Sequence, residues 1–120
     1  MAKILIVDDH VDTCEILRRL FQRAGWEATC VTDSTTAPDA VRASHCDAVL
    51  LDVMMPELDG FGVLSAIRAN PTTADTPVVM YSALSDEDTL MRALEAGADD
   101  YVPKGTPFGQ LRERIAAVAH

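Results

Sequence analysis

The chain has 120 residues, of which 48% are hydrophobic and 24% are charged, and its formal net charge is −9. This length and composition predict one globular domain with a single hydrophobic core. The acidic balance argues against nucleic-acid binding by this domain, because phosphate contacts need surfaces rich in Lys and Arg. The sequence contains no run of about 18 apolar residues, which excludes a transmembrane helix.

The first residues lead directly into a predicted strand, leaving no room for a signal peptide, so we expect the domain in the cytoplasm. Cys14, Cys30 and Cys46 are widely spaced and lack the paired spacing of a zinc site. We expect them to be reduced thiols with a structural role.

Apolar runs alternate with amphipathic helical patterns five times along the chain. Continuous runs of four or five aliphatic residues predict buried parallel strands, and apolar residues at 3/4 spacing predict helices. The predicted strands are residues 3–7, 27–31, 48–51, 78–82 and 100–102. The predicted helices are residues 11–24, 37–44, 61–69, 85–97 and about 107–118.

Residues with strong positional preferences mark several helix ends. Gly25 ends the first helix in the usual C-terminal place, and Pro38 is tolerated only in the first turn of the second. Ser85 is the predicted N-cap of the fourth helix, which ends at Gly97.

Strict alternation of strands and helices with short connections predicts an α/β fold with right-handed crossovers. Because helices are needed on both faces, we expect a doubly wound (βα)5 flavodoxin-like three-layer sandwich. Its parallel five-stranded sheet should have the order 2-1-3-4-5. The switch point then lies between the first and third strands, which end at Asp8-Asp9 and Asp52. Ligands of such sheets bind beyond the carboxyl ends of the strands at this point.

Charged residues follow three of the strands at this edge: Asp8 and Asp9, Asp52, and Lys104. Clustered acids repel one another and raise one another's pKa values unless a cation neutralises them. Three carboxylates and one ammonium group therefore predict a site for a hard divalent cation and a phosphoryl group. Capping of the following helix is an alternative role for Asp8 and Asp9, and it is compatible with metal binding.

Four segments together resemble the receiver domains of two-component response regulators, and are similar to the bacterial chemotaxis response regulator. They are residues 4–9, residues 50–56 followed by Asp59-Gly60, residues 81–83 and residues 97–104. The resemblance implies one receiver domain over residues 1–120, either alone or as the N-terminal part of a longer regulator. It implies a histidine kinase or phosphotransfer protein as phosphoryl donor and a downstream output domain or protein as target. We expect no membrane contact.

The resemblance also assigns roles at the strand ends. Asp52 is the expected phosphoacceptor, which forms an aspartyl phosphate. Mg²⁺ is the implied cofactor, with Asp9 and Asp52 as direct ligands, Asp8 acting largely through water, and the backbone carbonyl of Met54 as a further ligand. Lys104 is expected to reach the phosphoryl oxygens as a point charge.

Ser82 and Tyr101 are the expected switch residues. The Ser82 hydroxyl should hydrogen-bond the phosphoryl group, and Tyr101 should then turn from exposed to buried. This movement would remodel the surface of the fourth helix, fifth strand and fifth helix. The domain should catalyse only its own phosphorylation and a slow dephosphorylation. We expect the dephosphorylation to be slow because Met54 and Leu84 are too apolar to position a water molecule.

The sequence departs from the family pattern after Lys104, where Gly105 replaces the usual proline with its cis bond. A cis bond costs several kcal/mol more without proline, so we expect a trans or a strained cis Lys104–Gly105 bond. The Asp59-Gly60 turn is expected to need the backbone freedom of glycine. His10 is interpreted as a partly exposed residue at a helix start, rather than as a catalytic residue.

Two other functions are alternatives to phosphoryl acceptance. A Mg²⁺-dependent phosphatase would need a second acid where Met54 stands, and a cap domain that the chain lacks. An interaction module working without phosphorylation usually lacks one of the acids or the lysine. Homodimerisation on activation is left open, because the charges of Asp99, Asp100, Arg92 and Arg114 favour it whereas Leu90 and Gln110 interrupt the charge pattern.

Overall fold

The structure, a computed structural model, describes residues 2–83 and 86–119. Its five parallel strands form one sheet in the predicted order β2-β1-β3-β4-β5. The strands are β1 (Lys3–Val7), β2 (Glu27–Val31), β3 (Ala48–Asp52), β4 (Val78–Ser82) and β5 (Asp100–Pro103). The helices are α1 (Val11–Arg23), α2 (Ala37–Ser44), α3 (Gly60–Ala69), α4 (Glu87–Glu95) and α5 (Phe108–Val118), with a short 3-10 helix at Ser34–Thr36.

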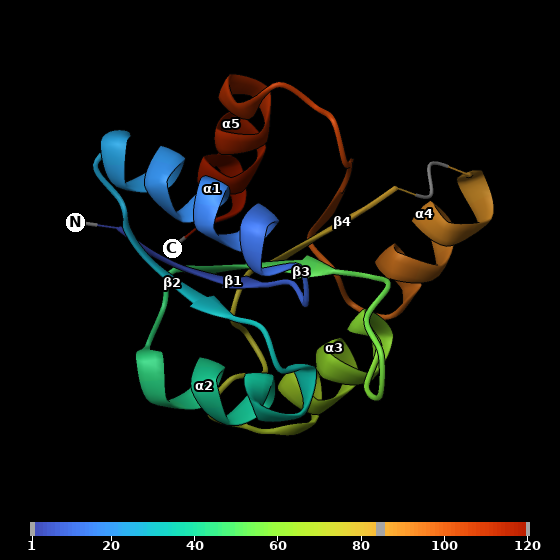
Figure 1. Cartoon of the computed structure of the whole chain (residues 1–120). Helices are drawn as coiled ribbons and strands as arrows, with labels where there is room; N and C mark the ends of the chain where they lie inside the picture. Colours follow the sequence, from blue (N-terminus) through green and yellow to red (C-terminus); the bar gives the residue numbers. More distant parts are fainter. Residues whose placement is uncertain (1, 84–85, 120) are drawn as a thin grey trace.

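The fold is the predicted three-layer sandwich (Figure 1). Helices α1 and α5 cover one face of the sheet, and α2 and α3 cover the other, with α4 packed on that second face near β5. Side chains alternate between the two faces along each strand, so neighbouring residues belong to different core clusters. The α1/α5 cluster includes Ile6, Leu50, Tyr81 and Val102, whereas the other includes Val7, Leu51, Met80 and Tyr101.

The central strand β3 is buried along its whole length, as its unbroken apolar sequence predicts. Gly25 ends α1 with a φ of +92°, in the left-handed region that glycine adopts without strain. Pro38 lies in the first turn of α2, where its missing N–H has no helical partner to lose. These local signals were interpreted correctly from the sequence.

The start of α4 differs from the prediction. Ser85 lies outside the described residues, and the N-cap is Asp86, whose carboxylate accepts a hydrogen bond from the Thr89 amide at 3.0 Å. A carboxylate at this position satisfies a free N–H group and interacts favourably with the helix dipole. The helix therefore begins later than the sequence indicated.

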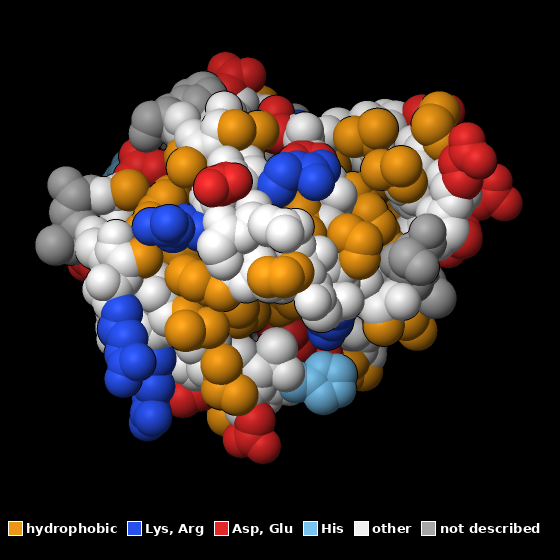
Figure 2. Space-filling view, turned by 90° about the horizontal axis from the view of Figure 1, so that it is seen from above, with side chains coloured by type: hydrophobic (Ala, Val, Ile, Leu, Met, Phe, Trp, Pro, Cys, Tyr) orange, Lys and Arg blue, Asp and Glu red, His pale blue; other side chains and the backbone are white. Residues whose placement is uncertain are grey.

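The face over α1 and α5 carries apolar side chains between scattered charges, while acidic side chains gather on the α4 side (Figure 2). Val11 and Ile16 are the most exposed large apolar residues of α1. Within residues 2–83 and 86–119, no helix has the length and apolar character needed to cross a bilayer. The three cysteines are free thiols, as expected.

Candidate metal and phosphoryl site

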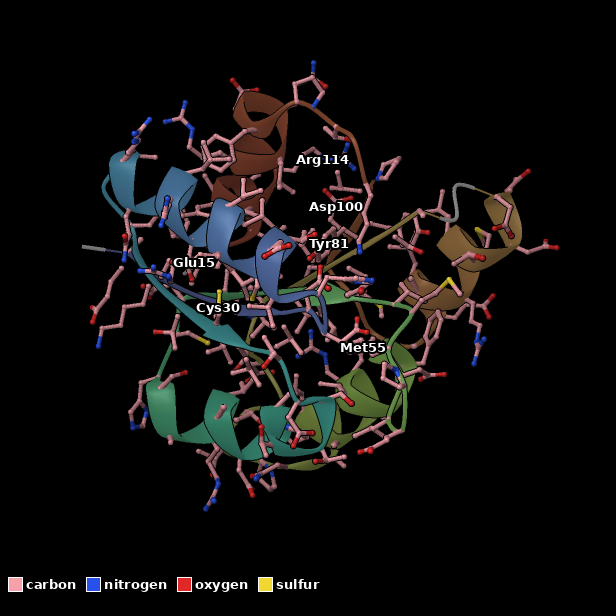
Figure 3. The ribbon with its side chains drawn as sticks, viewed as in Figure 1. Glu15, Cys30, Met55, Tyr81, Asp100 and Arg114 are labelled. Atoms are coloured by element: carbon pink, nitrogen blue, oxygen red, sulfur yellow. The ribbon has the colours of Figure 1, made fainter. Side chains whose placement is uncertain are left out.

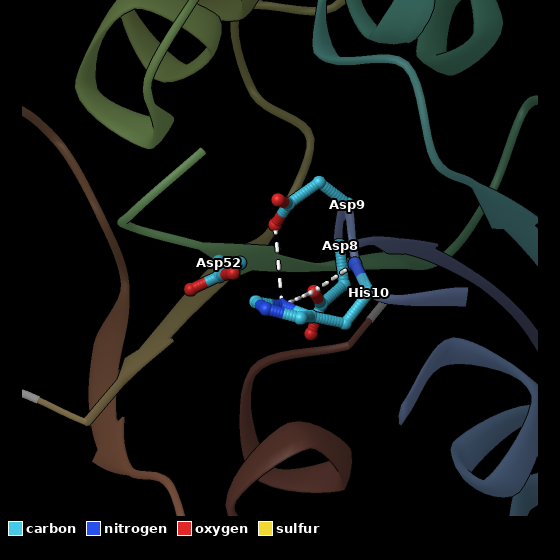
Figure 4. A group of neighbouring side chains, drawn as sticks. All are labelled: Asp8, Asp9, His10 and Asp52. Atoms are coloured by element: carbon cyan, nitrogen blue, oxygen red, sulfur yellow. Dashed lines mark hydrogen bonds and ion pairs between the residues drawn. The ribbon is translucent and has the colours of Figure 1, made fainter. Parts of the chain in front are cut away.

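Three carboxylates and one imidazole meet where β1 and β3 end. One ligand atom from each of Asp8, Asp9, His10 and Asp52 lies within 4.8 Å of all the others (Figure 4). Because Val7 pairs with Leu51 in the sheet, the residues that follow them are brought side by side. Asp8 and Asp52 are almost completely buried. The structure thus brings together the acids that the sequence placed at the switch point.

Lys104 supplies the positive charge for these acids. Its Nζ lies 3.2 Å from Asp52 Oδ2 and 3.4 Å from Asp8 Oδ2. The Lys104–Gly105 bond is trans, one of the two geometries that the sequence left open, and Gly105 has a φ of +93°. Glycine can adopt this left-handed conformation without strain, so the chain turns into α5 without the usual proline.

Tyr81 is a site neighbour that the sequence analysis did not single out. It is 4% exposed, and its hydroxyl donates a hydrogen bond to Asp8 Oδ2. Tyr81 is also the register partner of Asp52. Strand alternation contains the signal that was missed, because Val79 and Tyr81 of β4 must share a face with Leu50 and Asp52 of β3.

The two buried acids have opposite pKa shifts. Burial and the neighbouring charge of Asp8 raise the pKa of Asp52 to about 6, with Lys104 opposing this rise. Burial would also raise the pKa of Asp8, but hydrogen bonds from Tyr81 and the His10 amide, together with Lys104, bring it below its usual value. Burial and the Asp8 carboxylate raise the pKa of Tyr81, which keeps its hydroxyl a neutral donor.

His10 occupies the N-cap position of α1, without a capping hydrogen bond from its side chain. The alternative capping role of Asp8 and Asp9 is therefore wrong, because α1 begins at Val11 as predicted and its N-cap is His10. The His10 amide donates a hydrogen bond to Asp8 Oδ1 at 2.9 Å, and its Nδ1 lies 3.2 Å from that atom and 3.3 Å from Asp9 Oδ1. Its side chain is 63% exposed, as expected for a residue at a helix start.

The donors fit a hard divalent cation. Carboxylate oxygens are the ligands that such cations prefer. Within the described ranges, Asp9 Oδ1 is buried and accepts no hydrogen bond, which leaves this oxygen available for a metal ion. The Met54 amide lies 3.3 Å from Asp52 Oδ1, and the assignment of the Met54 carbonyl as a ligand stays a prediction.

Comparison with known proteins agrees with this geometry. A family model described as "Response regulator receiver domain" matches residues 4–116. The chain belongs to this family. It is 37% identical to the transcriptional regulatory protein PrrA of Mycobacterium tuberculosis, over 97% of this chain and 49% of that protein. It is 38% identical to a probable transcriptional regulator, ycf27, of Cyanophora paradoxa, over 97% of this chain and 47% of that protein.

Solved structures show the same fold in other receiver proteins. The chemotaxis protein CheY4 of Vibrio cholerae superimposes with a TM-score of 0.92 at 25% identity, covering 98% of both chains. The BeF3-activated receiver domain of Klebsiella pneumoniae RstA has a TM-score of 0.90 at 25% identity and 97% coverage of both. This receiver domain spans about half the length of the curated relatives that it matches.

The two expected switch residues of this receiver domain lie on the opposite face of the sheet from Asp52. Ser82 is 0% exposed, and Tyr101 is 5% exposed and belongs to the core cluster beneath α3 and α4. Burial raises the pKa of Tyr101, and a hydrogen bond with the Ser82 side chain opposes that rise. The structure therefore joins Ser82 and Tyr101 directly, with Tyr101 in the buried position.

The loop after β3 is held by contacts that the sequence did not reveal. Asp59 caps α3 by accepting a hydrogen bond from the Gly62 amide at 2.9 Å. Gly60 has no left-handed backbone, so the expectation that it provides backbone freedom is wrong. A Cβ atom at Gly60 would instead lie 2.3 Å from the Asp52 carbonyl oxygen and 2.8 Å from Val53 Cα. Leu84, expected to influence dephosphorylation, lies outside the described residues.

Proposed function

We propose that Asp52 of this response regulator receiver domain accepts a phosphoryl group from a histidine kinase or a phosphotransfer protein, with Mg²⁺ bound by Asp9 and Asp52 and assisted by Asp8. The observation that carries the proposal is the placement of Asp52. Its buried carboxylate lies 3.2 Å from the Lys104 ammonium and shares one small space with Asp8 and Asp9. If Asp52 only ended the strand and had no chemical function, it would need none of these contacts.

The chain's own residues support the transfer in distinct ways. The carboxylate of Asp52 is mostly ionised at neutral pH, since its pKa is about 6, and it forms the bond to phosphorus as the donor's bond breaks. Lys104 is placed to stabilise negative charge on the phosphoryl oxygens. When bound, Mg²⁺ supplies neutralising charge to the carboxylates and the phosphoryl oxygens.

In this proposal the domain acts on no substrate other than its phosphoryl donor. The domain assists its own phosphorylation, so a small donor such as acetyl phosphate should react slowly. Self-dephosphorylation should also be slow, because Met54 is apolar and 57% exposed beside the site and offers no group to hold water. The cytoplasmic location expected from the sequence stays a prediction.

Acetyl phosphate with Mg²⁺ tests the proposal, with intact-protein mass as the readout. The wild type should gain one phosphoryl group, and either EDTA or the substitution Asp52→Asn should abolish the gain. Asp39→Asn is the matched control, because Asp39 lies on α2 with a largely exposed side chain, and it should be labelled normally. Absence of an adduct under all conditions would support the interaction module, and rapid turnover of an added phosphate ester would support the phosphatase.

Phosphorylation should act on the outside surface through Ser82 and Tyr101. The Ser82 hydroxyl would move toward the phosphoryl group, and the contact between Ser82 and Tyr101 would then couple the site to α4, β5 and α5. The target of that surface is an output domain or a separate protein. Relatives that match this chain are named as transcriptional regulators, which supports an output of that kind.

The proposal also includes homodimerisation on activation, through the surface of α4, β5 and α5. Two of the acids considered for that interface are paired within the chain. Asp99 lies 3.1 Å from Arg68. Asp100 lies 2.5 Å from Arg114, and Figure 3 labels both residues of this pair. A dimer would have to share or exchange these pairs. Sedimentation velocity with beryllofluoride and Mg²⁺ measures this directly, and a monomer at high concentration would reject dimerisation.

A further inference from the structure

Tyr81 touches two residues of the proposed phosphorylation site at once. Its hydroxyl donates to Asp8 Oδ2, and the Lys104 Nζ lies 5.0 Å from the centre of its ring. Figure 3 shows Tyr81 between the sheet and the helices α1 and α5. The tyrosine therefore contacts both the acid and the cation that flank Asp52.

The ring of Tyr81 has an ordinary structural explanation, but the hydroxyl does not. The ring belongs to the apolar cluster under α1 and α5, where a phenylalanine or leucine would also fill space. A buried hydroxyl needs a hydrogen-bond partner, and here the partner is a site carboxylate rather than a backbone carbonyl. A charge-assisted bond of this kind is stronger than a neutral one.

The hydrogen bond divides the two oxygens of Asp8 between different neighbours. Oδ2 faces the Tyr81 hydroxyl and the Lys104 ammonium. Oδ1 accepts a hydrogen bond from the His10 amide and lies close to His10 Nδ1, which is in turn close to Asp9 Oδ1. Tyr81 thus fixes the rotation of the carboxylate, with Oδ2 on the side of Lys104 and Oδ1 on the side of His10.

Lys104 needs support from such a neighbour. Gly105, which follows it, is exposed and has no side chain, and an added Cβ there would meet no atom within 4 Å, so this residue packs against nothing that could hold the lysine side chain. The Tyr81 ring lies beneath the ammonium, and a cation over an aromatic face is attracted to it. Tyr81 and Lys104 also line one cavity of about 280 Å³ together with Leu17 and Leu111.

We propose that Tyr81 is a positioning residue of the phosphorylation site, which orients Asp8 through its hydroxyl and Lys104 through its ring. This inference rests on the proposed function of Asp52. Residues that orient metal-binding carboxylates typically contribute about 10- to 100-fold to metal affinity or activity. Removal of the hydroxyl should therefore weaken Mg²⁺ binding, even though the fold is retained.

The substitution Tyr81→Phe isolates the hydroxyl, and Tyr81→Leu removes both the hydroxyl and the ring. Val79→Ala is the matched control, because Val79 is buried on the same face of β4 two residues earlier and lies in the same core cluster. Mg²⁺ affinity is measured by calorimetry, and labelling of Asp52 is measured by intact mass with acetyl phosphate at sub-saturating Mg²⁺. Circular dichroism and thermal melting report whether each variant is folded.

We expect Tyr81→Phe to raise the Kd for Mg²⁺ about 10-fold and to slow labelling by a similar factor. Tyr81→Leu should slow labelling further at saturating Mg²⁺, because Lys104 loses its support. Val79→Ala should lower the melting temperature while leaving Mg²⁺ affinity within twofold of the wild type. If Tyr81→Phe matched the wild type in both affinity and rate, Tyr81 would be a core aromatic only.

Failure of the underlying function gives a different result. If the wild type took up no phosphoryl group, or if Asp52→Asn were labelled equally, the proposed function would be wrong and the role of Tyr81 would be lost with it. If the wild type were labelled at Asp52 and Tyr81→Phe were unchanged, only the inference about Tyr81 would be overturned.

Discussion

The ammonium nitrogen of Lys104 lies 3.2 Å from Asp52 Oδ2, although 52 positions separate the two residues in the sequence. Strand β4 pairs in parallel with β3 on one side and with β5 on the other, so the carboxyl ends of β3 and β5 lie on the same edge of the sheet. Lys104 is also close to Asp8, and one cation thus balances two buried carboxylates. Without a metal ion, the two buried carboxylates share this one ammonium, and this imbalance has measurable consequences.

Replacing Asp52 with Asn should stabilise the metal-free protein at neutral pH. The folded-state pKa of Asp52, about 6, lies above the value of about 3.9 in an unfolded chain. The folded state therefore holds more protons between these pH values, and stability falls as the pH rises through this window. At pH 7 in EDTA, we expect Asp52→Asn to raise the free energy of unfolding by about 1–3 kcal/mol.

Urea unfolding at pH 7 and at pH 4.5 measures this effect, and the gain should shrink at the lower pH, where Asp52 is protonated. The lowered pKa of Asp8 acts in the opposite direction, but only below about pH 4. Asp39→Asn should leave the pH slope of the wild type in place. A gain of the same size at both pH values would contradict the assignment to Asp52.

Mg²⁺ binding should weaken as the pH falls through the pKa of Asp52. The cation binds the ionised carboxylate, so protonation of Asp52 competes with metal binding. We expect the Kd for Mg²⁺, measured by calorimetry, to rise about 10-fold between pH 7 and pH 5. A Kd that stays constant over this interval would contradict competition between protonation of Asp52 and metal binding.

Replacing Lys104 with Gln should separate metal binding from phosphorylation. The ammonium lies close to two of the acids, so its removal relieves repulsion of a divalent cation and should tighten Mg²⁺ binding about fivefold, after discounting for partial exposure. Labelling by acetyl phosphate should slow about 10- to 100-fold, because a donor to the phosphoryl oxygens is lost.

Lys3→Gln provides the comparison for Lys104, because Lys3 lies at the far end of β1, is about half exposed and pairs with Glu27. Both affinity and rate should then match the wild type. If Lys104→Gln weakened Mg²⁺ binding instead, the lysine would act mainly by holding the carboxylates in place.

Gly60→Ala should destabilise the fold. The added Cβ would lie 2.3 Å from the backbone oxygen of Asp52 and 2.8 Å from Val53 Cα, and backbone atoms cannot move aside as a flexible side chain can. Overpacking of this kind costs about 1–3 kcal/mol, measured by urea unfolding. Gly109→Ala is the paired control, since it lies exposed in α5 with open space around it, and it should stabilise the protein by up to about 1 kcal/mol.

The sequence contained enough information to predict the path of the chain. Unbroken aliphatic runs gave the strands, and the 3/4 spacing of apolar residues gave the helices, because both patterns depend on contacts between near neighbours. The acids Asp8, Asp9 and Asp52 could be assigned to one crevice because the alternating order of elements predicts strands β1 and β3 as neighbours at the switch point. These predictions needed no knowledge of side-chain packing.

Other features depended on which side chains meet across the sheet. Tyr81 reads as one more apolar residue of a buried strand, and only its pairing with Asp52 brings its hydroxyl to Asp8. Gly60 reads as a flexible turn residue, but its actual constraint is the close approach of the β3 backbone.

The amino-acid order by itself determined the five repeated strand–helix units, the edge of the sheet that carries the charges, and the family to which they point. Only the tertiary structure decided that Tyr81 donates a hydrogen bond to Asp8, that the Lys104 ammonium bridges two acids, and that the Lys104–Gly105 bond is trans. It also decided that Tyr101 is buried beside Ser82. The physical reason is range. Periodicity reports the face on which a residue lies, whereas contacts between distant residues depend on strand register and on packing that no local pattern encodes.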